Sequence, residues 1–165
     1  MNVEKDYEDL LGLLNKNRVR YCIVGAYALA VYSHLRYTKD LDILIEANRE
    51  NAKRLPHRGC PDPLKETLMR GTDESFKRMR FKSLKLSEKD FIKKGRIIQL
   101  GYEPLRVDFL TSIEGVDFND VWKGRTMRKY GRYKVAYIGR QQLITNKKAA
   151  ARKQDRADLN HLLNE

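Results

Sequence analysis

The chain has 165 residues, 41% of them apolar, and a formal net charge of +12. This length fits one domain with its own core, and the apolar content excludes a disordered tail. No run approaches the roughly 20 apolar residues that span a bilayer, so we expect no membrane partner. The acidic, amphipathic start "MNVEKDYEDLL" is unlike a secretory signal, and the cytoplasm is the expected location.

The first third of the chain alternates between helical and strand patterns. Apolar residues at helical spacing predict an amphipathic helix over residues 3–17. A short buried strand follows at 20–24 and contains Cys22, which we expect in the core. Gly25 then precedes the helix-forming stretch "AYALAVYSH". Alternation in "DLDILIE" predicts a strand at 40–46, and residues 47–55 favour a helix that stops before Pro56.

The remaining two thirds begin with residues 56–95, where the pattern is least clear. Ser87, three residues before Asp90, indicates a helix start. Strands are predicted at 96–101 and 105–110, a short helix at 116–122 and a hairpin at 126–138. A last helix is predicted from about Arg140 to Leu163. The sequence therefore predicts one α/β (α+β) domain over residues 1–165, with a mixed sheet of four or five strands and packed helices.

Three aspartates interrupt apolar strands. Asp40 and Asp42 are two residues apart, so they share one face of their strand, where two like charges need a counter-ion. Asp108 lies in "LRVDFL" and joins them if the two strands are neighbours. Carboxylate oxygens suit Mg²⁺ or Mn²⁺, and two such ions about 4 Å apart clamp the oxygens of a phosphoryl transfer. The alternative is a strand with a solvated polar face.

Two further segments are candidate phosphate contacts. Gly25, between a strand and a helix, lets backbone N–H groups approach a phosphate; an ordinary strand-to-helix turn is the alternative. In the last predicted helix, Lys148, Arg152 and Asp155 share a face, and Asp158 lies one turn beyond Asp155. This face suits triphosphate oxygens, and an exposed, salt-bridged helix is the alternative.

The net charge is concentrated in two segments. Residues 65–96 carry eleven Lys/Arg and five Asp/Glu, and residues 123–134 carry six Lys/Arg and no acid. A nucleotide needs fewer cations than this, so the excess favours a long phosphate backbone such as RNA, for example a tRNA. The alternative is a basic surface that provides solubility only.

Together these segments resemble the nucleotidyltransferase superfamily with the polymerase-beta-like core. Its hallmark is a strand, a Gly-Gly or Gly-Ser turn, a helix, a strand with D-x-D and a later strand with a third acid. The similarity extends over roughly 20–55 and 86–163, and it is greatest to small proteins akin to the toxin of the AbiE abortive-infection system. The stretches that carry it are "RYTKDLDI", "IIQLGYEPLRVDFLTSIEGVDF" and "LITNKKAAARKQDRADL".

The resemblance implies a nucleotidyltransferase-like domain that uses Mg²⁺ or Mn²⁺ and a nucleoside triphosphate, in a toxin–antitoxin or phage-defence setting with a cognate antitoxin protein. It implies catalytic and metal-binding roles for Asp40, Asp42 and Asp108, and nucleotide contacts from Gly25, Ala26, Lys147 and Arg152. Three positions depart from the pattern: Ala26 replaces Gly or Ser, Ala151 a glycine and Gln154 a lysine. A binding or regulatory module with weak or no turnover is the alternative.

Overall fold

The computed structural model describes residues 4–33, 38, 40–55, 86–102 and 105–164. Residues 56–85, with Cys60 and the first part of the basic segment 65–96, lie outside the described residues. In the described part of the chain, no helix has both the length and the apolar character needed to cross a membrane.

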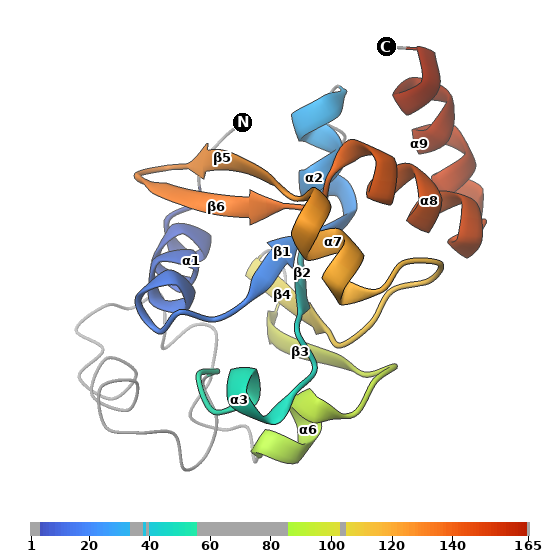
Figure 1. Cartoon of the computed structure of the whole chain (residues 1–165). Helices are drawn as coiled ribbons and strands as arrows, with labels where there is room; N and C mark the ends of the chain where they lie inside the picture. Colours follow the sequence, from blue (N-terminus) through green and yellow to red (C-terminus); the bar gives the residue numbers. More distant parts are fainter. Residues whose placement is uncertain (1–3, 34–37, 39, 56–85, 103–104, 165) are drawn as a thin grey trace.

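One six-stranded mixed sheet forms the centre of the structure (Figure 1), in the order β3-β4-β2-β1-β6-β5. The strands are β1 (Tyr21–Ile23), β2 (Asp40–Ile45), β3 (Ile97–Tyr102), β4 (Leu105–Leu110), β5 (Thr126–Tyr130) and β6 (Tyr133–Tyr137). The β2–β4 and β1–β6 pairs are parallel, and the other three are antiparallel. The mixed α/β fold class is confirmed. The expected four or five strands are too few, because the whole 126–138 hairpin joins the sheet by pairing β6 with β1.

Seven described helices connect and cover the strands. They are α1 (Lys5–Lys16), α2 (Gly25–Tyr32), α3 (Arg49–Ala52), α6 (Glu88–Ile92), α7 (Phe118–Gly124), α8 (Arg140–Ala150) and α9 (Lys153–Asn164), of which α3 and α6 are the two shortest.

The C-terminal helix predicted over Arg140–Leu163 is wrong as a single helix. Ala151 has a left-handed backbone (φ 51°) and ends α8, and α9 begins at Lys153. A left-handed residue is a common helix C-cap because its N–H bonds back to the last turn, here to the carbonyl of Lys147. The break removes the single helix face on which Lys148, Arg152 and Asp155 were predicted to lie.

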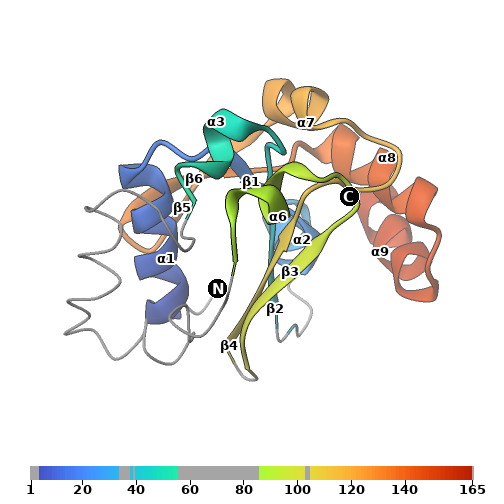
Figure 2. The same cartoon turned by 90° about the horizontal axis from the view of Figure 1, so that it is seen from below.

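The core lies on the apolar positions that the sequence pattern predicted. Leu41, Ile43 and Ile45 on β2 are fully buried, as is Cys22 on β1. At the start of α6, Ser87 and Asp90 form the reciprocal capping box that their spacing indicated. In the two views of Figures 1 and 2, α1 and the α8–α9 pair lie on opposite sides of the central strands.

Candidate active site

The three strand aspartates lie on two neighbouring strands. β2 and β4 pair in parallel, with Asp42 opposite Asp108 and Asp40 opposite Arg106. Residues paired across a ladder point to the same face, and neighbouring strands are about 4.8 Å apart. The prediction that these strands are adjacent is therefore confirmed, and one face of the sheet carries all three carboxylates.

This polar face is partly shielded from water. Asp108 is only 8% exposed, and the side chain of Asp40 is 24% exposed. The opposite face of the same strands packs into the core through Leu41 and Val107, both fully buried. The strands are therefore anchored by apolar packing on one side, which presents the carboxylates at fixed positions on the other.

Arg106 provides a counter-charge for two of these carboxylates. Its guanidinium Nη2 donates to Asp40 Oδ2, and its Nε lies 3.3 Å from Asp108 Oδ1. Gln99, the partner of Asp108 on β3, places its amide Nε2 3.4 Å from Asp108 Oδ2. In this structure the positive charge between Asp40 and Asp108 is therefore the guanidinium of Arg106.

The donor chemistry of this face fits a hard divalent cation. Asp108 Oδ1 is buried and has the Arg106 ion pair but no hydrogen bond. Carboxylate oxygens are the ligands that Mg²⁺ and Mn²⁺ prefer. As arranged here, the described residues contain no group of three His, Cys, Asp or Glu side chains ready to hold a metal. A cation shared by the three aspartates therefore requires their side chains to converge.

The turn at Gly25 lies against the second aspartate. Gly25 has a left-handed backbone (φ +62°), begins α2, and a Cβ added to it would lie 2.0 Å from Asp42 Oδ2. The backbone N–H of Val24 donates to the Asp42 carbonyl at 3.0 Å, which fixes the turn beside β2. Only glycine combines this conformation with this closeness. Ala26 follows it and is buried, at 3% exposure.

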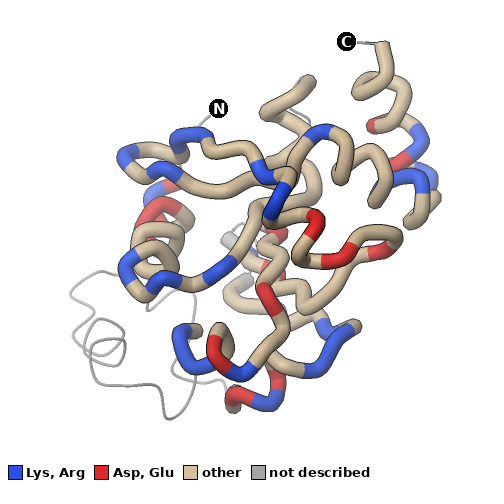
Figure 3. Tube along the Cα trace, in the orientation of Figure 1, with Lys and Arg blue, Asp and Glu red and all other residues tan. Residues whose placement is uncertain are grey.

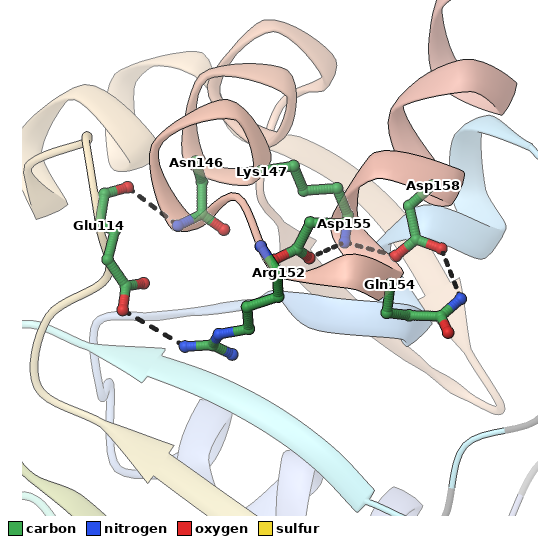
Figure 4. Close-up of polar contacts among 7 residues, drawn as sticks. All are labelled: Glu114, Asn146, Lys147, Arg152, Gln154, Asp155 and Asp158. Atoms are coloured by element: carbon green, nitrogen blue, oxygen red, sulfur yellow. Dashed lines mark hydrogen bonds and ion pairs between the residues drawn. The ribbon is translucent and has the colours of Figure 1, made fainter.

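Lys147 and Arg152 occupy a separate polar cluster at the α8–α9 junction (Figure 4). Lys147 is 4% exposed, and its Nζ lies 3.0 Å from Asp155 Oδ1 and 2.6 Å from Asp158 Oδ2. Arg152 is exposed and lies 3.3 Å from Glu114 Oε1. Their contacts with a nucleotide stay predictions, and Lys147 would have to leave buried ion pairs to make one.

Most of the basic segment 123–134 lies in the β5–β6 hairpin, where Lys and Arg gather along the edge of the sheet (Figure 3). Arg128, Lys129 and Lys134 are exposed there. Arg132 is paired with two acids of α1, since its guanidinium lies 3.4 Å from Glu8 Oε1 and 3.0 Å from Asp9 Oδ1. Part of the hairpin charge is therefore neutralised within the chain.

The sequence pattern gave no functional role to Arg106. The available signal was its position two residues before the third aspartate, because i and i+2 share a strand face. The pairing with Asp40 had no such signal, since it depends on the register of β2 against β4.

Comparisons with known proteins add a likeness to a solved structure at low similarity. No protein-family model matches the chain, and no curated protein matches it. A crystal structure of a lincosamide antibiotic adenylyltransferase, with lincomycin bound, is similar to it with a TM-score of 0.48 and 15% identity, over 99% of this chain and 98% of that chain. A TM-score and an identity this low carry no argument about activity or substrate.

Proposed function

We propose that this single-domain chain is a metal-dependent nucleotidyltransferase that transfers a nucleoside monophosphate from a nucleoside triphosphate to a hydroxyl acceptor. The observation that carries the proposal is the pairing of Asp42 with Asp108 across β2 and β4, with Asp40 on the same face and the Gly25 turn against Asp42. The order strand, glycine turn, helix, D-x-D strand and third-acid strand is that of the superfamily that the sequence resembles.

The proposed roles follow from position. Asp40, Asp42 and Asp108 would hold Mg²⁺ or Mn²⁺, which when bound neutralises phosphate charge and lowers the pKa of an acceptor hydroxyl. Asp108 would take the hydroxyl proton. The backbone at Gly25 and Ala26 begins α2 and would receive the β and γ phosphates. The acceptor oxygen forms a bond to the α phosphorus as the bond to pyrophosphate breaks.

Thermal unfolding with a panel of nucleoside triphosphates, with and without Mg²⁺, tests this proposal. A Mg²⁺-dependent rise in Tm with at least one triphosphate is expected for the wild type and should be lost in Asp42→Asn. The matched control is Asp120→Asn, which removes an exposed carboxylate on α7 and should keep the rise. No shift with any nucleotide would refute the proposal.

A second candidate is a binding or regulatory module that uses the fold without turnover. Two observations favour it: the Arg106 guanidinium already pairs with Asp40 and Asp108, and Ala26 stands at the second position of the turn. A toxin–antitoxin or phage-defence setting with an antitoxin partner is compatible with both candidates. Asp42→Asn should abolish a biological effect of the enzyme and preserve one that depends on surface contacts alone.

The proposed acceptor is RNA, such as a tRNA, on the basis of the charge in residues 65–96 and 123–134. The exposed cations of the β5–β6 hairpin are part of that charge. If the protein makes six phosphate contacts, raising the salt from 50 to 200 mM should weaken RNA binding by about 10³-fold. Labelled tRNA should show this steep dependence, and weak, salt-insensitive binding would remove RNA as the acceptor.

A further inference from the structure

Arg106 is placed between two of the carboxylates that the proposed metal needs. It is the register partner of Asp40 and lies two residues before Asp108, so its side chain projects from the carboxylate face of β4. Nη2 contacts Asp40, and Nε lies 3.3 Å from Asp108 Oδ1. The Arg106 side chain is 30% exposed, so it has solvent on one side into which it can move.

The backbone of Arg106 is held more firmly than its side chain. The hydroxyl of Tyr7, a residue 1% exposed on α1, donates to the Arg106 carbonyl at 3.0 Å. On the other side, β4 is paired with β3, where Gly101 is the partner of Arg106. A change at this position is therefore expected to be a rotation of the side chain with the strand in place.

A guanidinium and a divalent cation compete for the same carboxylate oxygens. Each neutralises the like charges on this face, and the pairing with Arg106 uses Asp40 Oδ2 and Asp108 Oδ1. A cation that bridges Asp40 and Asp108 must displace the guanidinium from at least one of them. Displacement has a smaller free-energy cost if an incoming phosphate offers Arg106 a new anionic partner.

We propose that Arg106 is a built-in counter-cation that holds Asp40 and Asp108 until nucleotide arrives, so that metal and triphosphate bind cooperatively. This inference rests on the proposed nucleotidyltransferase site and adds its regulation. Without nucleotide, Arg106 lowers the affinity of the site for metal. With nucleotide, it moves from the carboxylates to a phosphate, and the two ligands strengthen each other's binding.

Mn²⁺ binding to the full chain, measured by the electron paramagnetic resonance signal of free Mn²⁺, tests the competition without any turnover. Arg106→Gln is expected to tighten nucleotide-free Mn²⁺ binding about tenfold, which corresponds to about 1.4 kcal/mol. Arg106→Lys, which cannot fork between two carboxylates, should tighten it a few-fold. Arg96→Gln, which removes one positive charge at an exposed position, is the matched control and should bind as the wild type does.

The second measurement is the coupling between Mn²⁺ and a non-hydrolysable triphosphate. The nucleotide should strengthen Mn²⁺ binding more in the wild type than in Arg106→Gln. Circular dichroism establishes whether each variant is folded. If Arg106→Gln is not folded, the same comparison with the wild type is made with Arg106→Lys.

The outcomes separate this inference from the function on which it rests. The competition is refuted if the wild type binds Mn²⁺, Asp42→Asn does not, and the Arg106 variants bind Mn²⁺ no more tightly than the wild type. The metal site itself would stand in that case. This result would mean that Arg106 positions the carboxylates for metal. No Mn²⁺ binding by any variant would overturn both the metal site and the inference.

Discussion

Removal of the Lys147 ammonium should destabilise the α8–α9 junction strongly. Lys147→Met keeps the length of the side chain but leaves Asp158, which is 2% exposed, without its 2.6 Å ion pair. Gln154 Nε2 lies 3.4 Å from the other oxygen of that carboxylate, Oδ1, and brings no positive charge. Breaking a buried pair by removing one partner costs about 3–5 kcal/mol.

The expected loss is large enough to measure by two methods. For a chain of this size, about 1 kcal/mol corresponds to roughly 2–4 °C, so Tm should fall by roughly 6–20 °C. Urea unfolding followed by circular dichroism should show a lower midpoint with an unchanged m value. Lys148→Met, at the exposed neighbouring position, is the matched control and should change stability by less than about 0.5 kcal/mol.

A double-mutant cycle isolates the pair itself. Lys147→Met, Asp158→Asn and the double variant should give a coupling free energy of roughly 1–3 kcal/mol. If Lys147→Met costs no more than Lys148→Met, the buried ion pairs do not stabilise the junction. Lys147 would then be free to serve as the nucleotide contact that the sequence resemblance implies.

Gly25→Ala should lower Tm and abolish Mg²⁺-dependent nucleotide protection, since it puts a Cβ 2.0 Å from Asp42 Oδ2 in a left-handed backbone; an unchanged thermal profile would contradict this. Burial raises the pKa of the Cys22 thiol to about 12, so in a Cys60→Ser background it should react with a thiol reagent at pH 8 only after unfolding. Hydrogen bonds from the helix cap lower the pKa of Asp90 from its ordinary 3.8. The charged carboxylate therefore stabilises the fold above pH 3.8, and this stabilisation disappears as the pH falls through the lowered pKa. Unfolding free energies of wild type and Asp90→Asn should therefore differ at pH 7 and converge as the pH falls through the lowered pKa.

Local patterns in the sequence were sufficient for most of the secondary structure. The alternation of Leu41, Ile43 and Ile45 with two aspartates predicted β2, because only a strand places them on opposite faces. The spacing of Ser87 and Asp90 predicted the start of α6 for a similarly local reason. The last helix failed because no sequence rule signals a left-handed backbone at an alanine such as Ala151.

The sequence by itself determined that Asp40 and Asp42 share a face and that Asp108 interrupts another strand, since both follow from the two-residue period of a strand. Only the tertiary structure decided that β2 and β4 are parallel neighbours in the register that aligns Asp42 with Asp108 and Asp40 with Arg106. It also decided that Lys147 is buried between two acids, because α9 turns back onto α8 after Ala151. Strand order, register and helix packing are set by contacts between segments far apart in the chain, and these long-range contacts leave no periodic signal in any one segment.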